Sequence, residues 1–294
     1  MRHYAMPIAG IQQSSIAHIA MDSLLAASSL HERLGESGAE VVKKNKFGQT
    51  SLRIDVECEQ IIIETLRKSG LPFRIISEEY GQTDVSARPE LLAVLDGLDG
   101  TKTYRKERGH GRYGTMLGIF SNINPKYQEY IFSGVAEHAL QRIVFGIRGK
   151  GAYIRRQNSE TSTHSTGSKQ LHTKTKIGID DYFPFNRDIY LPVFGYLPQI
   201  KQFASESRYV DVATGIADLA LECSRKGNLE IAAAYGLIRE AGGAIVDEEG
   251  EEIGLKEYLE FAQDSQRLII TAATPELAKI AVEELRRWKK FKRE

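Results

Sequence analysis

The spacing of apolar and polar residues divides the first half of the chain into alternating helix and strand candidates. Apolar positions at helical spacing predict an amphipathic helix over 13–35 and a second helix that opens at Asp55 and ends at Gly70. Between them, the polar stretch 44–54 with its glycine predicts a loop or hairpin. The stretch 157–176, rich in Ser, Thr, Lys and Gln, predicts an exposed loop or irregular hairpin. Short β-type runs lie at 73–77, 91–95, 112–120, 130–138 and 141–149, with a tight turn and return strand in 149–156.

The second half alternates helix and strand more regularly. Helices are predicted over 208–226, ended by Gly227, and over 230–241, ended by two glycines. Thr274, followed by proline and glutamate, predicts the start of a last helix. Strand candidates occupy 176–180, 244–247 and 267–273. A strand-rich half followed by an alternating half predicts a layered α/β (α+β) enzyme fold.

Composition and charge narrow the class of protein. The 294 residues suit one large domain or two smaller ones, and 41% hydrophobic with 27% charged residues is typical of a soluble globular protein. Lys+Arg and Asp+Glu both number 39, so no global field favours nucleic acid or an anionic membrane. No apolar run reaches the roughly 18 residues of a membrane span, and the first residues lack the pattern of a signal peptide.

The cysteines and histidines give no sign of a disulfide framework or a zinc site. Cys58 and Cys223 both lie in apolar, helix-like patterns, which fits a reducing cytoplasmic location. The seven histidines are scattered without zinc-ligand spacing. We therefore expect a cytoplasmic protein without nucleic-acid or membrane partners.

Acidic residues follow two of the predicted strands. Glu78 comes directly after 73–77, and Asp96 comes directly after 91–95. If the two strands run the same way in one sheet, both acids emerge at the same edge. Asp99 follows Asp96 across a turn with two glycines, so both carboxylates and the Leu98 carbonyl can face one point. Oxygen ligands of this kind suit a hard divalent cation such as Mg²⁺.

Simpler interpretations compete with a metal site. A single D-x-x-D-G-T stretch is often a turn capped by aspartate, and Glu78 with Glu79 resembles a solvated loop. Two such motifs, each closing a β-type run, favour the metal site. A helix that starts after Gly100 would add free N–H groups for a phosphate, with the Thr101 hydroxyl beside the cations.

The chain resembles the inositol monophosphatase superfamily of Mg²⁺-dependent, lithium-sensitive phosphatases, which includes fructose-1,6-bisphosphatases and 3′(2′),5′-bisphosphate nucleotidases. The family pattern is an acid pair, then D-P-[IL]-D-G-[TS], then W-D-x-A-A before E-A-G-G. Its counterparts here are SEEYG (77–81), LDGLDGT (95–101) and LEIAAAYGLIREAGGAIVD (229–247). The resemblance extends over nearly the whole chain from about residue 13. It implies alternating α-β-α-β-α layers, with residues 1–175 carrying most metal ligands and 176–294 completing the site and binding the leaving group.

The resemblance also assigns roles to individual residues. Two or three Mg²⁺ ions are implied: one held by Glu78, Asp96 and the Leu98 carbonyl, one by Asp96, Asp99 and Glu230, and a weaker third served by Glu78. Thr101, paired with Asp55, would orient the attacking water, and one ion would lower the pKa of that water while the other steadies the leaving oxygen. Gly100, Thr101 and Lys102 would contact the substrate. From the residues alone, Asp55 also fits a helix N-cap, and Glu230 a first-turn acid at a helix dipole.

Three positions depart from the family pattern. Gly97 replaces the usual proline, which we expect to loosen the turn, and Leu229 replaces the tryptophan. Glu230 stands where aspartate is usual, and its extra methylene can shift the second metal and the substrate.

The expected substrate is a small phosphorylated metabolite, an inositol phosphate or sugar phosphate. DGTK followed by an aromatic residue is similar to the nucleotidase branch, and the basic residues of 102–112 fit either a second phosphate or a solvated loop. A different class of function stays open, a non-catalytic homologue that binds a phospholigand or a partner protein. Family resemblance also implies a homodimer and inhibition by lithium.

Overall fold

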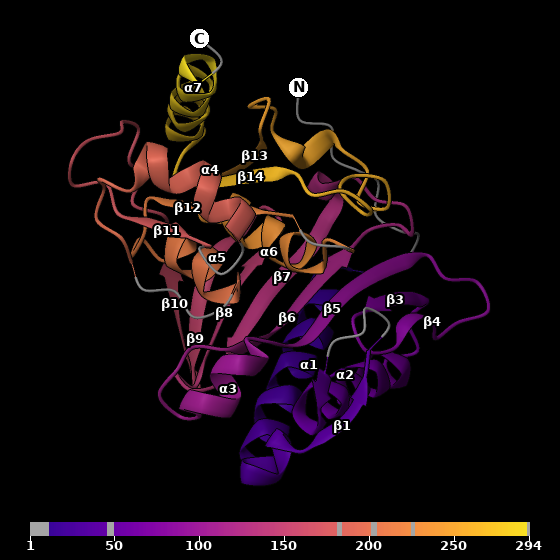
Figure 1. Cartoon of the computed structure of the whole chain (residues 1–294). Helices are drawn as coiled ribbons and strands as arrows, with labels where there is room; N and C mark the ends of the chain where they lie inside the picture. The colour runs from indigo at the N-terminus through magenta and orange to yellow at the C-terminus, as the bar shows by residue number, and fades with distance from the viewer. Residues whose placement is uncertain (1–11, 46–49, 181–183, 201–204, 225–226, 293–294) are drawn as a thin grey trace.

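A computed structural model describes residues 12–45, 50–180, 184–200, 205–224 and 227–292 of the chain. Helices and sheets alternate in five layers (Figure 1). The residues on which the expected absence of a signal peptide rests lie outside these ranges. The middle of the expected loop or hairpin over 44–54 also lies outside them. Within these ranges, no helix combines the length and apolar character that crossing a membrane requires.

The first layer consists of two helices that pack on one face of the large sheet. Helix α1 (Gln13–Leu34) matches the predicted helix, and its buried residues lie along one stripe. Helix α2 (Arg53–Lys68) begins two residues before the predicted start, so Asp55 is its third residue rather than its cap. Strands β1 (Val41–Lys44) and β2 (Thr50–Leu52) pair antiparallel between the helices, which confirms the hairpin alternative.

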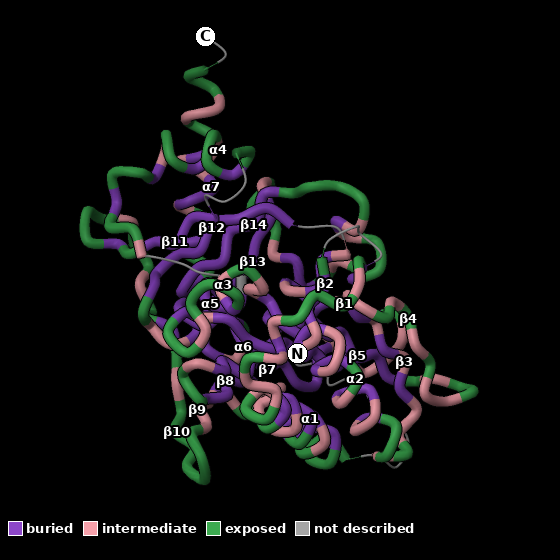
Figure 2. The backbone as a smooth tube through the Cα atoms, turned by 60° about the horizontal axis from the view of Figure 1, so that its bottom comes forward, coloured by how far each residue is buried: buried purple, intermediate pink, exposed green. Residues whose placement is uncertain are grey.

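The second layer is an eight-stranded sheet in the order β10-β9-β8-β7-β6-β5-β3-β4. Only β3 and β5 pair in parallel, and the other neighbours are antiparallel. The central strands are buried on both faces, whereas β10 at one edge is largely exposed and β4 at the other edge alternates between half-buried and exposed residues (Figure 2). The strands are β3 (Phe73–Ser77), β4 (Gly81–Asp84), β5 (Leu91–Asp99), β6 (Gly114–Phe120), β7 (Tyr130–Glu137), β8 (Arg142–Ile147), β9 (Gly151–Arg156) and β10 (Ser159–Thr163).

The middle layer contains α6 (Leu229–Glu240) and α5 (Ser205–Ala213), and α6 lies across β5–β8. Small residues permit this close contact. A Cβ on Gly118 of β6 would meet the Ala233 Cα of α6 at 2.9 Å, so the helix backbone rests almost directly on the strand. Helix α6 therefore holds its first turn firmly against the sheet.

A four-stranded sheet and two outer helices complete the layers. The strand order is β11-β12-β14-β13, and α4 and α7 cover its outer face (Figure 1). This confirms the predicted layered α/β fold with α-β-α-β-α order. The division at residue 175 into two functional parts stays a prediction. The elements are β11 (Ile177–Ile179), α4 (Pro184–Phe194), β12 (Leu219–Cys223), β13 (Ala244–Asp247), β14 (Leu268–Ala272), α7 (Pro275–Phe291), the short α3 (Thr101–Glu107) and the 3₁₀ turns Gly35–Ala39, Tyr127–Glu129 and Ile253–Leu255.

The prediction of one helix over 208–226 is wrong. Helix α5 ends at Ala213, Gly215 adopts a positive φ of 72°, and Leu219–Cys223 form the buried strand β12. A short apolar run looks the same in a buried helix and in a strand buried on both faces, so periodicity does not separate them. Cys223 is consequently a strand residue, and the expected helical pattern around it is wrong as well.

Candidate metal centre

Two carboxylates come from neighbouring parallel strands. Strands β3 and β5 pair in register with Ser77 opposite Leu95, so Glu78 and Asp96 follow at the same edge. This confirms the arrangement expected from the sequence. The Leu98 amide donates a 3.0 Å hydrogen bond to Asp96 Oδ1 and fixes its side chain.

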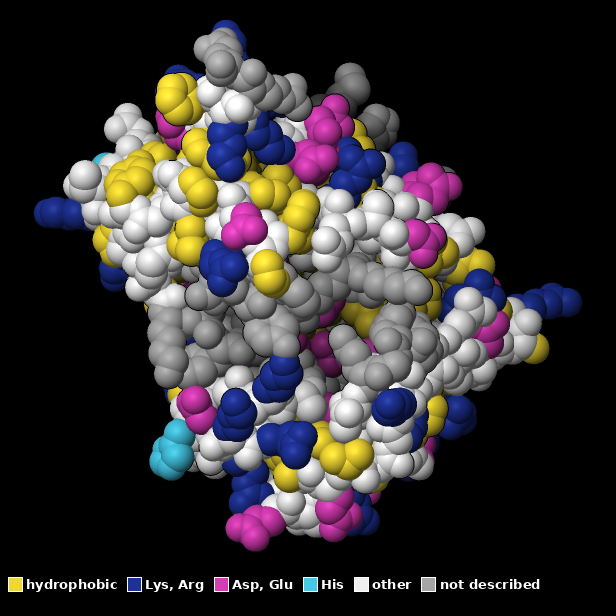
Figure 3. Space-filling model, viewed as in Figure 1, with side chains coloured by type: hydrophobic (Ala, Val, Ile, Leu, Met, Phe, Trp, Pro, Cys, Tyr) yellow, Lys and Arg dark blue, Asp and Glu magenta, His cyan; other side chains and the backbone are white. Residues whose placement is uncertain are grey.

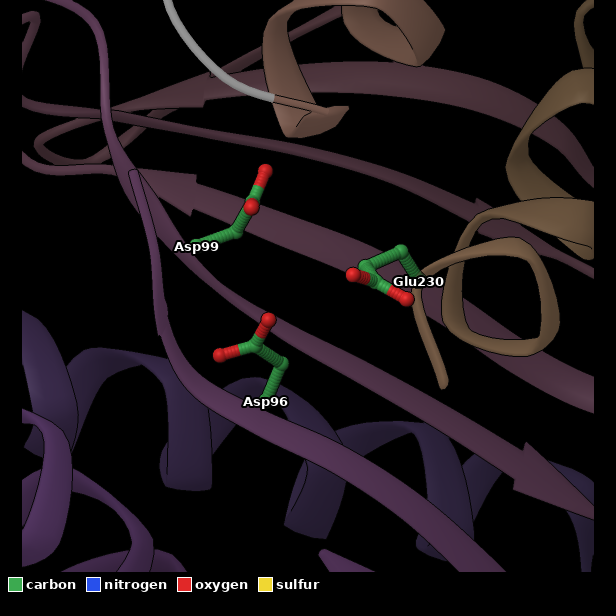
Figure 4. A group of neighbouring side chains, drawn as sticks. All are labelled: Asp96, Asp99 and Glu230. Atoms are coloured by element: carbon green, nitrogen blue, oxygen red, sulfur yellow. The ribbon is translucent and has the colours of Figure 1, made fainter. Parts of the chain in front are cut away.

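Asp99 and Glu230 lie beside Asp96 although they come from separate elements. The pairing of β5 with β6 is irregular between Asp96 and Asp99, and this bulge lets both side chains face the same region. Glu230 is the second residue of α6, after Asn228 in the left-handed conformation. Oxygen atoms of Asp96, Asp99 and Glu230 all lie within 4.8 Å of one another, around one common space (Figure 4).

The residues fit a hard divalent cation. Three carboxylates at this separation repel one another unless positive charge lies between them, and all the ligand atoms offered are oxygens, as Mg²⁺ prefers. Acidic side chains are visible at the bottom of a hollow in the middle of one face of the molecule (Figure 3).

Burial and mutual repulsion dominate the electrostatics of the site. Desolvation, with the nearby Glu230 carboxylate, raises the pKa of Glu78 to about 8. Desolvation, followed by the charges of Glu78 and Asp99, raises the pKa of Asp96 well above its ordinary value. Without a cation the raised pKa values favour the protonated carboxyl groups, and a bound cation would displace those protons.

Asp55 and Thr101 form a hydrogen-bonded pair next to the acidic cluster. The Thr101 hydroxyl lies 3.3 Å from both Asp55 Oδ1 and the Leu98 carbonyl oxygen. As the third residue of α2, Asp55 also accepts the amide of the N-cap residue Leu52 at Oδ2 at 2.5 Å, and this bond coexists with the pairing to Thr101. Burial raises the pKa of Asp55 to about 7. The pair can hold or pass a proton at the hydroxyl oxygen.

Two residues that support Glu78 were missed from the sequence. Glu59 Oε1 accepts the amides of Glu78 at 3.0 Å and Glu79 at 3.1 Å, and thereby shapes the turn that carries the ligand. Asn45 Nδ2 donates to Glu78 Oε1 at 2.8 Å. Glu59 follows Asp55 by four on α2, and this shared helix face was a usable signal. Nothing in the local sequence indicates Asn45.

The predicted helix start after Gly100 is confirmed. The basic residues that follow it, within 102–112, differ in their surroundings. Gly100 has a positive φ of 95° and precedes α3, on which Lys102 is exposed. Arg112 is instead held by ion pairs to Glu137 at 2.7 Å and to Asp211 at 2.5 Å. The two roles expected for Arg112, binding a second phosphate and lying in a solvated loop, are therefore both wrong. Arg112 instead connects β6 and β7 to α5. Helix α5 in turn contacts the acidic cluster, because the Glu206 amide donates to Asp99 Oδ2 at 2.6 Å.

Gly97 packs tightly rather than loosening the turn. A Cβ at this position would lie 2.3 Å from the Asp55 carbonyl oxygen and 2.8 Å from Glu59 Cγ. The first of these contacts is with backbone, which cannot rotate away. The glycine therefore lets the start of α2 approach the turn between Asp96 and Asp99.

Gly97→Ala is expected to lower the free energy of unfolding by about 1–3 kcal/mol, as overpacking in a core does, and to separate Asp55 from Thr101. Gly70→Ala is the matched control. No atom of the described residues lies within 4 Å of its added Cβ, so it carries only the strain of a φ of 72°, about 1 kcal/mol. Denaturant unfolding of both variants measures the difference. If both variants lost the same free energy of unfolding and Gly97→Ala kept its activity, the close packing at Gly97 would be contradicted.

Without divalent cations, stability is expected to fall as the pH rises from about 6.5 to 8. Glu59, Glu78 and Asp96 have raised pKa values, about 8 for the first two, mainly because of burial. In this window the folded chain keeps protons that the unfolded chain, with carboxyl pKa values near 4, has lost. Because the folded state binds more protons than the unfolded state, the free energy of unfolding falls as the pH rises, by on the order of 1–3 kcal/mol per pH unit.

Denaturant unfolding in EDTA at pH 6.5 and pH 8 measures this slope. Burial lowers the pKa values of His31 and His138, so these two rings contribute a smaller slope of opposite sign, confined to the lower end of this pH range. Adding Mg²⁺ at pH 8 is expected to restore the lost stability. A metal-free protein that is equally stable at both pH values would refute the electrostatic account.

Comparison with known proteins identifies the family to which the chain belongs. The model of the inositol monophosphatase family matches residues 12–288. The bifunctional NADP phosphatase/NAD kinase of Methanococcus maripaludis is 28% identical over 239 residues, which cover 75% of this chain and 41% of the relative. The chain thus spans about two fifths of that relative's length. The fructose-1,6-bisphosphatase/inositol-1-monophosphatase of Methanothermobacter thermautotrophicus is 26% identical over 228 residues, covering 74% of this chain and 78% of the relative.

A solved structure supports the fold. The extragenic suppressor protein suhB of Bartonella henselae superposes with a TM-score of 0.73 at 18% identity, covering 92% of this chain and 98% of that one. At this identity the likeness extends to the layered architecture and no further.

Proposed function

The chain belongs to the inositol monophosphatase family, and from this premise we propose that it is a Mg²⁺-dependent phosphomonoesterase acting on a small phosphorylated metabolite. The observation that carries the proposal is the convergence of Asp96, Asp99 and Glu230 from two elements far apart in sequence. Three carboxylates around one space are costly without cations, and Glu78 at the same edge adds a fourth. The proposed complement is two or three Mg²⁺ ions.

The ligand roles follow the positions of the oxygens. Glu78, Asp96 and the Leu98 carbonyl would hold one ion, and Asp96, Asp99 and Glu230 another. Bound Mg²⁺ would offset the charge of the phosphate group and make a water molecule more acidic. The carboxyl protons that burial retains in the metal-free chain would leave when the ions bind.

Thr101 and Asp55 would position the attacking water. The Thr101 hydroxyl donates to Asp55, which leaves the lone pairs of its oxygen to accept a hydrogen bond from water. Asp55 is itself anchored by the Leu52 amide, so the pair is rigid. The proton of the water can pass through the hydroxyl to the Asp55 carboxylate, which would act as the general base.

The substrate-binding roles of Gly100, Thr101 and Lys102 are part of the same proposal. The positions of Gly100 and Thr101 at the start of α3, beside the acidic cluster, support it. Inositol and sugar phosphates are the favoured substrates, with 3′(2′),5′-bisphosphate nucleotides as the alternative. The names of two relatives add fructose 1,6-bisphosphate and NADP to the candidates. A homodimer, lithium inhibition and a cytoplasmic location remain expectations from the sequence.

The test is phosphate release from a panel of substrates with and without Mg²⁺. The panel comprises inositol 1-phosphate, fructose 1,6-bisphosphate, 3′-phosphoadenosine 5′-phosphate, NADP and an aryl phosphate. Mg²⁺-dependent release from at least one compound is expected, and the preferred compound identifies the branch. No release from any of them, with Mg²⁺ bound, would contradict the proposal and favour a non-catalytic phospholigand- or partner-binding homologue.

A further inference from the structure

A polar cavity of about 390 Å³ is lined by residues outside the acidic cluster. It opens between the second half of α1 and the strands β8 and β9, and none of the proposed metal ligands lines it. Its size is within the usual range for small-molecule sites. The residues used below are His31, His138, Gln141, Arg142, Arg155 and Gln157.

The buried imidazole of His138 has one defined hydrogen-bond direction. Its Nε2 lies 2.9 Å from Thr115 Oγ1, and the Thr115 hydroxyl donates its single proton to the Gly97 carbonyl at 2.7 Å. Nε2 must therefore carry the hydrogen in this contact. In the neutral ring, Nδ1 is then an acceptor.

Among the described residues, no donor reaches Nδ1 of His138. Nδ1 of His138 is buried and has no hydrogen-bond partner in the part of the chain that the structure describes. His31 stacks on the ring at a centroid distance of 4.5 Å and offers it only its face. Burial lowers the pKa of His138 well below its ordinary value, so the ring stays neutral. An unsatisfied buried acceptor is costly, and a ligand with an O–H or N–H group would satisfy it.

Two guanidinium groups, each ion-paired to a glutamate, line the cavity. Arg142 uses Nε for Glu137, and its terminal nitrogens have no hydrogen-bond partner among the described residues. Arg155 binds Glu160 through Nη1 and the Gln157 carbonyl through Nε. The remaining N–H groups suit a phosphate or carboxylate. Glu32 at the rim is the acidic group among the lining residues.

We infer that this cavity binds a small hydroxylated organic anion, that is, a phosphorylated or carboxylated polyol, at a site separate from the acidic cluster. The anionic group meets Arg142 and Arg155, a hydroxyl donates to His138 Nδ1, and Gln141 and Gln157 bind the remaining polar atoms. The same His138 ring holds Thr115, which holds the Gly97 carbonyl. Occupancy is thus linked by two hydrogen bonds to the turn between Asp96 and Asp99, and its effect on turnover rests on the proposed function.

The test uses the full chain in EDTA, where the acidic site has no cation to hold a phosphate, labelled with ¹⁵N at its seven histidines, and follows the imidazole nitrogens of His138 by NMR. Glycerate and glycerol 3-phosphate are the two anionic probes, and they distinguish a carboxylate from a phosphate ligand. At least one is expected to shift the Nδ1 signal saturably, whereas glycerol, without charge, and acetate, without hydroxyls, leave it unchanged. No shift with either anion would overturn the inference.

Arg155→Gln is expected to weaken binding of the effective probe about tenfold or more, the usual loss of a charge-assisted hydrogen bond. Arg156→Gln is the matched control, since Arg156 is the exposed neighbour on the opposite face of β9 and is expected to leave the affinity unchanged. Equal affinities for both variants would refute the site.

Hydrolysis of an aryl phosphate supplies the second readout. Saturating glycerate is expected to change turnover at least twofold in the unmodified chain and not in Arg155→Gln. A chain that binds the probe at His138 but releases no phosphate would refute the proposed function and leave the cavity inference standing.

Discussion

Asp96→Asn is expected to abolish Mg²⁺-dependent phosphate release, with a loss of at least about 10³-fold in kcat. Asp96 shares one space with Asp99 and Glu230, and its carboxylate is proposed to contact both ions. Several kcal/mol of transition-state stabilisation depend on such cations, and about 4 kcal/mol corresponds to 10³ in rate. Initial rates of phosphate release measure the effect.

The same variant is expected to be more stable than the unmodified chain in EDTA at pH 8. Burial and the charges of Glu78 and Asp99 oppose an ionised Asp96, and asparagine removes that charge while its oxygen can still accept the Leu98 amide. Asp84→Asn is the control: this exposed acid on β4 pairs with Arg74, and its loss should leave kcat unchanged. An Asp96→Asn variant that retains full activity would refute the assigned role.

Thr101→Val is expected to lower kcat by about 10²- to 10⁴-fold with little change in Mg²⁺ affinity. Valine keeps the shape of threonine and removes the hydroxyl that donates to Asp55 and faces the proposed water. The expected range is that of a positioned proton-transfer group. Steady-state kinetics and a Mg²⁺ titration of both proteins separate the two quantities.

Thr101→Ser keeps the hydroxyl and is expected to restore most of the activity. Glu57→Gln, on the same helix as Asp55 but paired with Arg53, is expected to have no effect. If Thr101→Val and Thr101→Ser were equally active, the hydroxyl would have no part in the reaction.

Much of the candidate site could be predicted because its ligands follow strong local signals. Glu78 and Asp96 each terminate a short apolar run, and only the parallel pairing of β3 with β5 was needed to bring them together. Glu230 could be found only through the family motif, since nothing local distinguishes it from an acid at a helix start.

The remaining features depend on packing that the local sequence does not encode. Glu59 and Asn45 act through the turn and side chain of Glu78, and the close approach of Asp55 to Gly97 reverses the expected loosening of the turn. Strand β12 was mistaken for a helix because its residues are all apolar or buried. Arg112 appeared to be a free cation until its ion pairs with Glu137 and Asp211 were seen.

The central claim, that Asp96, Asp99 and Glu230 hold divalent cations, is tested most directly by anomalous diffraction from a crystal grown with Mn²⁺ in place of Mg²⁺. The account predicts at least one strong anomalous peak within about 2.5 Å of oxygens from these carboxylates. A fully occupied Mn²⁺ elsewhere, with no peak among these three residues, would contradict it.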